Sequence, residues 1–307
     1  MNKYIEFSII RDIANELGFQ DCGASKAEEV DISFFEKWLN KGYDADMHYM
    51  RNYLDKRNNP SLLLEDSKSI ISFIVSYNSY NPDNKDNKTY NFASYSHYYD
   101  YHKSIKLKFL ELINRLQQIY PDFIAIPYVD SAPILEKYWA KTSGLGSIGR
   151  NSLLINKEYG SKILIGEIIT NYSTDYHISQ EEDLCKDCRK CVDACPNGAI
   201  NNDKTIDSRL CNAYHTIENK GEIPNNINLN SFVFGCDICI NACPWNKNTQ
   251  VTDSKILTLN TNMQVLIDSI NNNKAEKSIF NKAKKNSPIE RIKFEKLLSN
   301  IKESSKH

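Results

Sequence analysis

Apolar residues recur along the first 170 residues with two different periods. Ile5, Ile9, Ile13 and Leu17 repeat at helical spacing, and Gly18 is well placed to end that helix. The same spacing predicts further helices over residues 34–39, 105–116 and 134–141. Short runs rich in Ile, Val and Phe predict strands over residues 70–77, 123–129, 153–155 and 162–169. Helices that alternate with strands indicate an α/β or α+β domain.

Polar and turn-forming residues mark the breaks between these segments. Asp31 or Ser33 would start the second helix, and Gly42 would stop it. Residues 78–91 contain a proline and many Asn and Asp residues, so they are expected to form a loop. Beyond about Trp245 the pattern predicts two polar helices.

Eight of the nine cysteines lie between residues 185 and 243. Thiolates spaced by two residues can wrap one face of a cubane iron–sulfur cluster, and the fourth cysteine of such a run ligates the neighbouring cluster. We therefore expect two [4Fe-4S] clusters with crossed ligands. The first would take Cys185, Cys188, Cys191 and Cys243, and the second would take Cys195, Cys211, Cys236 and Cys239. Cys22 is left over, as a small buried hydrophobe.

Zinc and disulfides are weaker interpretations of the same cysteines. Zinc favours two well-separated C-x2-C pairs around one tetrahedral site. Here three cysteines fall within seven residues, and a fourth is followed directly by Pro196. Disulfides suit a small secreted scaffold, not a chain of 307 residues with an odd number of cysteines.

Composition narrows the class of protein. A hydrophobic fraction of 41% and a charged fraction of 25% are typical of a soluble globular protein. The net charge of -1 gives no global signature of polyanion binding, but residues 251–307 carry eleven Lys and Arg against six Asp and Glu. The first residues do not resemble a signal peptide, and no apolar run is long enough to cross a membrane. Reduced cysteines then indicate the cytoplasm.

Residues 144–149 read Gly-Leu-Gly-Ser-Ile-Gly and match the dinucleotide-binding pattern G-x-G-x-x-G. That fingerprint needs a strand before it and a helix after it. Here the predicted order is reversed, with the helix over 134–141 before the glycines and the strand over 153–155 after them. A nicotinamide site is therefore not expected, although a glycine-rich loop lets the backbone approach some other large ligand.

Asp130 follows the predicted strand over 123–129, where sheets often face a ligand crevice. A carboxyl flanked by apolar residues can have its pKa raised by desolvation and act as a general acid. The same carboxyl could instead cap a helix that starts near Pro133. The aromatic segment 95–102 could likewise line a pocket for a planar ligand or simply pack at the start of a helix.

The cysteine pattern also limits the kind of reaction. Clusters of this type carry one electron each at low potential. A ferredoxin module needs only some 60 to 80 residues, whereas about 175 residues precede this one. The extra length implies a catalytic site that the clusters supply with electrons, and two one-electron carriers suggest a two-electron reduction.

Taken together, these motifs resemble the epoxyqueuosine reductase family, which performs the last step of queuosine synthesis in tRNA. The resemblance extends from about Gly42 to Asn246 and is specific because many motifs occur in one order. They are the segment 129–136 (Val-Asp-Ser-Ala-Pro-Ile-Leu-Glu), Gly144, Gly146, Gly149, Asn151 and Ser152, the four-cysteine run, Ile206, Asp207, Arg209, Cys211 and Glu218, and the segment 235–246 (Gly-Cys-Asp-Ile-Cys-Ile-Asn-Ala-Cys-Pro-Trp-Asn).

The resemblance implies a cobalamin cofactor, two [4Fe-4S] clusters and a tRNA substrate whose epoxyqueuosine is reduced to queuosine at the wobble position. It makes Asp130 the proton donor, and desolvation would hold its proton near neutral pH. Members of the family bind the corrin without a protein ligand beneath the cobalt, in keeping with the absence of a D-x-H-x-x-G motif. The corrin contacts are then expected at Arg57, Tyr95, Lys141, Gly146, Gly149, Asn151 and Ser152.

We accordingly expect an α+β protein in three parts. Residues 1–175 would form a cobalamin-binding α/β catalytic domain, residues 176–250 a ferredoxin-like module with two [4Fe-4S] clusters, and residues 251–307 a basic helical tail. Many members continue into a helical-repeat extension, so contact with the anticodon stem-loop of tRNA is assigned here to the tail and to residues 204–220.

The electron donor would be a low-potential protein such as a flavodoxin or ferredoxin, and the protein is expected to be a cytoplasmic monomer that does not contact a membrane. Two alternatives remain open. One is a corrinoid reductive dehalogenase-like reductase, although the twin-arginine signal usual for such enzymes is missing. The other is a ferredoxin-like electron-transfer protein without a corrin.

Overall fold

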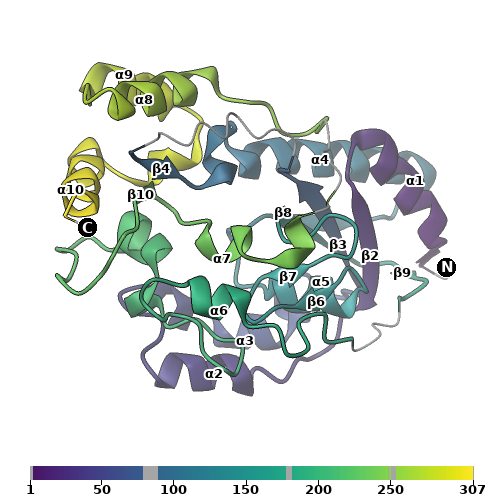
Figure 1. Ribbon diagram of the computed structural model, residues 1–307. Coiled ribbons are helices and arrows are strands. Elements are labelled where there is room, and N and C mark those ends of the chain that lie inside the picture. Colours follow the sequence, from purple (N-terminus) through teal and green to yellow (C-terminus); the bar gives the residue numbers. More distant parts are fainter. Residues whose placement is uncertain (1–2, 79–88, 178–181, 248, 250–253, 307) are drawn as a thin grey trace.

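The centre of the protein is a four-stranded antiparallel sheet with the strand order β2-β3-β8-β5. The computed structural model describes residues 3–78, 89–177, 182–247, 249 and 254–306. The strands of the sheet are β2 (Asp21–Lys26), β3 (Ser69–Ser76), β5 (Ala125–Tyr128) and β8 (Ile163–Thr170). Helices cover both faces, and the two termini lie at opposite ends of the molecule (Figure 1).

One face of the sheet is covered by α1 (Phe7–Leu17) and α4 (Tyr101–Ile119). Alternate residues of β3, among them Ile71 and Phe73, point into this core because successive side chains of a strand face opposite sides. Phe109 of α4 packs so closely on β8 that a Cβ at Gly166 would lie 2.7 Å from its ring. This face is therefore covered mainly by apolar side chains.

The opposite face is covered by α5 (Glu136–Thr142) and, beside it, by α2 (Ser33–Asn40) and α3 (Leu54–Asn58). Trp139 of α5 is 2% exposed and packs against Ile70 and Ile169. The same face also buries Ser72 and Glu167, which are paired across β3 and β8. This face is therefore mixed in polarity, in contrast to the first. The 3-10 turn η1 (His48–Arg51) lies between α2 and α3, and the 3-10 turn η2 (Pro60–Leu62) lies between α3 and β3.

The pattern of apolar residues predicted most of this layer correctly. The helix over 5–17 ends where expected, because Gly18 adopts a left-handed conformation with φ 97°. α2 begins at Ser33, whose N–H donates to Asp31 Oδ1 at 2.8 Å. Strand β2 was missed, because its sequence Asp-Cys-Gly-Ala-Ser-Lys has little strand propensity and is ordered by its pairing with β3. Most of the expected loop over 78–91 falls on residues outside those described.

The described residues also form three short strand pairs outside the central sheet. Two are parallel pairs between distant segments, and the third is a hairpin that contains the glycine-rich loop. They are β1 (Tyr4–Ile5) with β9 (Ser173–Thr174), β4 (Asn91–Phe92) with β10 (Phe232–Phe234), and β6 (Ser147–Ile148) with β7 (Leu154–Ile155).

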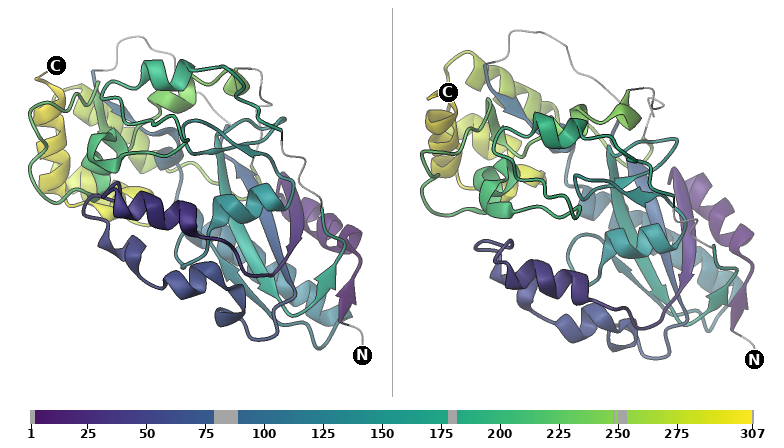
Figure 2. Two further views of the ribbon diagram at one scale, coloured as in Figure 1. Left: turned by 90° about the horizontal axis from the view of Figure 1, so that it is seen from below. Right: turned by 60° about the horizontal axis from the view of Figure 1, so that its bottom comes forward.

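The cysteine region lies beside the sheet domain, with two short helices side by side at its centre (Figure 2). Its elements are α6 (Lys190–Ala194), the 3-10 turn η4 (Ser208–Leu210), the π-helical turn η5 (Tyr214–Glu218), α7 (Ile238–Asn241) and the 3-10 turn η6 (Pro244–Asn246). Asp237, just before α7, is buried and accepts hydrogen bonds from the N–H and the hydroxyl of Ser94. The second cysteine run is thus held against the segment that precedes α4.

The tail differs from the expected pair of polar helices. Its described part contains three α-helices and a 3-10 turn, and they bury a core of their own against β4 and β10. The elements are α8 (Thr261–Asn271), α9 (Lys277–Ala283), η7 (Pro288–Arg291) and α10 (Phe294–Ser304). The prediction failed because the apolar residues of the tail are few but converge, with Met263, Phe280 and Leu297 each at most 1% exposed.

Within the described residues, no helix is both long and apolar enough to cross a membrane.

Candidate active site

The eight cysteines of the second half are predicted to act in two groups of four, and their thiols influence one another across the two cysteine runs. Burial raises the pKa of the Cys243 thiol, and Cys185 and Cys188 raise it further. Burial also raises the pKa of Cys236 to about 12, with contributions from Cys211 and Cys195. Thiols of the two runs therefore lie near one another, which is compatible with the crossed assignment, but Cys191 also acts on Cys239 and the ligand sets stay a prediction.

The surroundings of the thiols suit clusters. The N–H of Arg150 donates to Cys185 Sγ at 3.4 Å, and the N–H of Ala199 donates to Cys195 Sγ at 3.3 Å. Amide hydrogen bonds to sulfur are among the features that set the potential of an iron–sulfur cluster. Thiolates are soft ligands of the kind that iron–sulfur clusters take, although no three His, Cys, Asp or Glu side chains of the described residues are already drawn together around one metal position.

The glycine-rich loop between residues 144 and 152 lies against both cysteine groups. Its Arg150 donates from Nε to the carbonyl of Cys188 at 2.9 Å and from a terminal nitrogen to the carbonyl of Lys186 at 2.6 Å. Burial raises the pKa of the Cys239 thiol, and a hydrogen bond from the buried side chain of Asn151 lowers it. Arg150, which resembled an ordinary surface residue in the sequence, therefore orders the loop of the first cysteine run.

The glycines of this loop are needed for close packing within the chain. A Cβ at Gly146, where φ is 155°, would lie 2.2 Å from the carbonyl oxygen of Ile155. A Cβ at Gly149 would lie 2.7 Å from the Ile155 side chain. Helix α5 precedes the loop and β7 follows it, as the sequence predicted, so the dinucleotide pattern is coincidental.

Asp130 stands two residues beyond β5 in a strained left-handed conformation, with φ 47°. Its N–H donates to Glu136 Oε1 at 2.5 Å. The alternative role as a helix cap is wrong, because α5 begins only at Glu136 and no side chain caps its first turn. The first residue of α5 instead holds the backbone of Asp130, and its carboxyl group is left to face the site.

The Asp130 carboxylate is held by the first two residues of α4. The Tyr101 hydroxyl donates to Asp130 Oδ2 at 2.9 Å, and His102 Nε2 lies 3.5 Å from the same oxygen. Burial raises the pKa of Asp130, but the hydrogen bonds from His102 and Tyr101 outweigh it, so the net pKa is lowered. The expectation that desolvation keeps a proton on Asp130 is therefore wrong for this arrangement.

Two other carboxyl groups near Asp130 do hold their protons. Burial and the neighbouring charge of Asp130 raise the pKa of Glu136 to about 8. Glu167 lies on the sheet beneath α5, is fully buried and has no hydrogen-bond partner for either carboxyl oxygen. Burial raises its pKa well above the ordinary value, and Glu136 adds to the shift. The three carboxyls thus differ in protonation at neutral pH.

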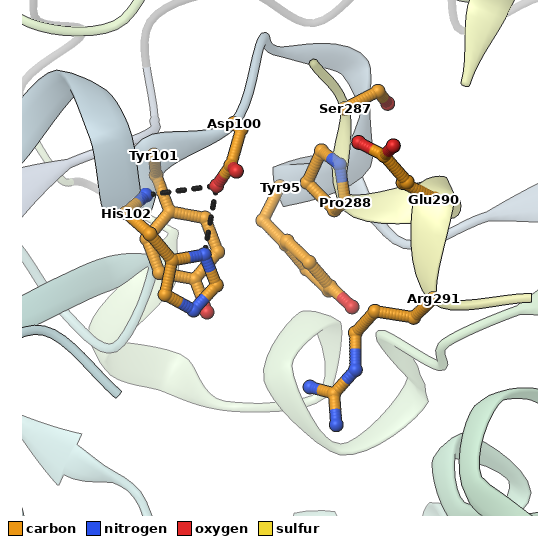
Figure 3. A pocket seen from close by; sticks show the side chains of 8 residues that line it. All are labelled: Tyr95, Asp100, Tyr101, His102, Ser287, Pro288, Glu290 and Arg291. Carbon is orange, nitrogen blue, oxygen red and sulfur yellow. Dashed lines mark hydrogen bonds and ion pairs between the residues drawn. The ribbon is translucent and has the colours of Figure 1, made fainter. Parts of the chain in front are cut away.

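A cavity of about 270 Å³ is lined by Tyr101 and His102, the two residues that hold the Asp130 carboxylate. Figure 3 shows the stacked Tyr101 and His102 rings on one side, with the side chains of Tyr95 and Arg291 beside them. The lining residues are Tyr95, Asp100, Tyr101, His102, Ser287, Pro288, Glu290 and Arg291. Half of them belong to the tail, so the tail forms part of the site wall.

Arg291 is the arginine among the lining residues of this cavity. It forms an ion pair with Glu218 of the cysteine region, and its charge helps to lower the pKa of Asp130. Tyr49 of η1 lies near the same pair and is 49% exposed. Sequence reasoning missed Arg291, Glu136 and Tyr49 as site residues. Glu136 stood within the matched motif, but nothing in the sequence places residue 291 beside residue 130.

The other residues assigned to a cofactor lie apart from the cavity lining. Arg57 is buried, its guanidinium lies 5.3 Å from the centre of the Phe35 ring, and its Nε has no partner. Lys141 occupies the last turn of α5. The carbonyl of Ser152 accepts a hydrogen bond from Lys137 Nζ at 2.8 Å. Tyr95 alone of the predicted cofactor residues lines the cavity, and Cys22 is buried in β2 as expected.

Two family models match the chain. The model described as "Epoxyqueuosine reductase QueG, DUF1730" matches residues 57–131. The model described as "4Fe-4S double cluster binding domain" matches residues 184–246, which include all eight cluster-type cysteines. The first match ends just after Asp130.

Similar proteins agree with these models. A curated epoxyqueuosine reductase from Cyclobacterium marinum is 36% identical over 297 residues, which is 95% of this chain and 94% of that protein. The structure of epoxyqueuosine reductase from Streptococcus thermophilus superposes with a TM-score of 0.78 at 26% identity and covers 96% of this chain and 79% of that one. A crystal structure of epoxyqueuosine reductase with an epoxyqueuosine-modified tRNA-Tyr stem loop gives 0.74 at 24% identity, over 91% and 80% of the chains. This chain belongs to the epoxyqueuosine reductase family.

Proposed function

We propose that this chain carries out the reaction of its family, the reduction of epoxyqueuosine in tRNA to queuosine, with cobalamin placed between two [4Fe-4S] clusters and the substrate. One observation carries the proposal. The consecutive residues Arg150, Asn151 and Ser152 contact, in turn, the first cysteine group, Cys239 of the second group and Lys137 of α5. This loop therefore joins the cysteine region to the helix that holds the Asp130 turn.

The cysteines divide the electron-carrying role between two clusters. Cys185, Cys188, Cys191 and Cys243 would hold one cluster, and Cys195, Cys211, Cys236 and Cys239 the other. Each cluster would carry one electron at a time. Removal of an epoxide oxygen as water takes two electrons and two protons. Two clusters that each carry one electron therefore supply the number of electrons that one turnover needs.

The fit of cobalamin rests on buried polar side chains that the chain leaves wholly or partly unsatisfied. The Nε of Arg57 is a buried nitrogen without a hydrogen-bond partner, and the amide of Asn151 is buried beside the Cys239 thiol. Such groups are costly unless a ligand satisfies them. Together with Tyr95, Lys141, Gly146, Gly149 and Ser152 they would hold the corrin. The bound cofactor would supply a strongly nucleophilic reduced metal centre.

The proton chemistry belongs to the chain itself. Asp130 would give a proton to the epoxide oxygen, because an alkoxide is a poor leaving group unless it is protonated. Tyr101 and His102 fix the carboxyl oxygen that would carry this proton. Glu136 fixes the backbone of the same residue. The acid is thus set in place before the substrate arrives.

The tRNA would reach this site between the sheet domain and the tail. Arg291 lines the cavity, and the lysines of α9 and of residues 204–220 could neutralise phosphates of the anticodon stem-loop. The modified base would have to leave the stack to enter the cavity. A low-potential protein such as a flavodoxin or ferredoxin would supply the electrons.

The test is nucleoside analysis of tRNA that carries epoxyqueuosine. The anaerobically reconstituted protein, with cobalamin and a low-potential reductant, should convert epoxyqueuosine to queuosine. Parallel reactions without cobalamin or without the reductant should not. A protein that carries both clusters but converts nothing in the complete mixture, and fails to bind cobalamin, would be a ferredoxin-like electron carrier. Reduction of an organohalide in preference to the tRNA would indicate a dehalogenase.

A further inference from the structure

The imidazole of His102 lies between two carboxylates. Its Nδ1 is 2.8 Å from Asp100 Oδ1, and its Nε2 is 3.5 Å from Asp130 Oδ2. A neutral imidazole carries only one N–H, so it can serve only one of these acceptors as a donor. The imidazolium carries two, and it is stabilised by both negative charges. The geometry therefore favours a charged ring.

Asp100 is held rigidly in this arrangement. It is the N-cap of α4, and its Oδ1 accepts the N–H of His102 at 3.0 Å as well as facing the ring. Its own N–H donates to the carbonyl of Asn286 in the tail at 2.7 Å. The ring of His102 stacks on that of Tyr101, with centroids 4.0 Å apart and 24° between the planes. The orientation of the imidazole is thus set by Asp100 and Tyr101, which precede it in the chain. The tail in turn holds the backbone of Asp100.

Charged and titratable groups surround His102 on several elements. Tyr101 and Lys103 lie on the same helix, Glu136 starts α5, Tyr95 precedes α4, and Glu290 and Arg291 face the cavity from η7. Burial lowers the pKa of His102, but the hydrogen bonds and charges of Asp100 and Asp130 raise it to about 9. The two adjacent carboxylates therefore outweigh the effect of burial.

We infer that His102 stores the proton that Asp130 passes to the substrate, and that Asp100 is the positioning residue that keeps it there. The catalytic half of this inference rests on the proposed function. In each pass, the Nε2–H bond of His102 breaks, Asp130 Oδ2 takes the proton, and Asp130 gives it to the epoxide oxygen. Two passes supply both protons of the departing water, while the two electrons enter through the clusters from the low-potential donor.

The ring can be recharged between passes. The side chain of His102 is 32% exposed, so the solvent that fills the cavity can return a proton to it. Asp130 alone would be a poor store, because the same contacts that raise the pKa of His102 lower its own. In this site His102 thus holds the proton, and Asp130 transfers it to the substrate.

The first test is an NMR titration of the histidine rings in the cluster-loaded protein without cobalamin or tRNA. The chain has six histidines, and the signal of His102 is the one lost in His102→Gln. It should titrate with a midpoint near 9. In Asp100→Asn, the midpoint should fall by about one unit or more, because a negative charge beside the ring is lost. Asn is as good an N-cap as Asp, so α4 is retained.

A matched control removes a similar aspartate elsewhere. Asp31 also accepts an N–H at the start of a helix, from Ser33 of α2, and Asp31→Asn should leave the His102 midpoint unchanged. A wild-type midpoint near the ordinary value of 6.5 would overturn the inference. So would a midpoint that does not move in Asp100→Asn.

The second test is the pH profile of kcat/KM on tRNA that carries epoxyqueuosine. Activity should fall on the alkaline side as His102 loses its proton, and Asp100→Asn should move that fall to lower pH by the shift seen in the titration. A uniform loss at every pH, with the profile unmoved, would mean that Asp100 is merely structural. If the wild type converts no substrate at any pH, the proposed function and the catalytic half fail together, whereas the titration still decides where the proton lies.

Discussion

The cysteine region and the acid site differ in how the sequence specifies them. Seven of the eight cluster-type cysteines lie in two short runs, and their spacing follows from the shape of the cluster they would bind. The acid site draws on α4, the turn after β5, the start of α5 and η7 of the tail. The first is specified by local spacing, and the second by the course of the chain through the fold. The cysteine site is visible in the sequence, whereas the sequence points to Asp130 and to the segment 95–102 without showing that they meet each other and Arg291.

The largest expected effect is on the cysteine region. Cys236→Ser should lower the iron content from about eight to about four atoms per chain, because one cluster loses a ligand, and tRNA turnover should stop. Iron analysis and turnover measure both. Cys22→Ala is the matched control, because Cys22 is buried in β2 away from the two groups and should keep its full iron. Full iron in Cys236→Ser would exclude Cys236 as a ligand.

The next largest effect is expected at Asp130. Asp130→Asn should reduce turnover by roughly 10²–10⁴-fold, the usual contribution of a general acid. Asn tolerates the left-handed backbone at this position and can still accept the Tyr101 hydrogen bond, so folding and iron content should not change. Asp122→Asn, before β5, removes a similar charge away from the site. Undiminished turnover in Asp130→Asn would remove Asp130 as the acid.

The same contrast explains what the sequence could predict. Helical and strand periods located α1, α4, β3 and β8, because these elements bury a regular face. They did not show β2, whose order depends on its neighbour, or the packed core of the tail. The family motif pointed to Asp130 but not to its protonation state, because that depends on His102 and Tyr101, which lie 28 and 29 residues away.

A smaller effect is expected at Arg291, the tail's contribution to the acid site. Arg291→Gln removes the ion pair with Glu218 and the positive charge that acts on Asp130. We expect kcat/KM for tRNA to fall about tenfold, an amount typical of one lost charge-assisted contact. Lys293→Gln removes the same charge from an exposed position outside the cavity lining. Equal losses in both variants would mean that Arg291 acts only as part of a general basic surface.

The smallest effect concerns stability. It compares the face of the sheet under α5, which buries Glu167, with the apolar face under α1 and α4. Glu167 is fully buried with a raised pKa, so the folded protein keeps this proton at pH values where the unfolded chain has lost it. Stability should therefore fall as pH rises above about 4.5, up to the folded pKa of Glu167. Gln binds no proton, so the Tm of Glu167→Gln relative to wild type should increase by a few degrees between pH 5 and pH 8. Glu111→Gln, on the exposed side of α4, should show no such trend in anaerobic melts. If the Tm difference of Glu167→Gln also shows no trend with pH, the Glu167 carboxyl is not held in its neutral form within the sheet.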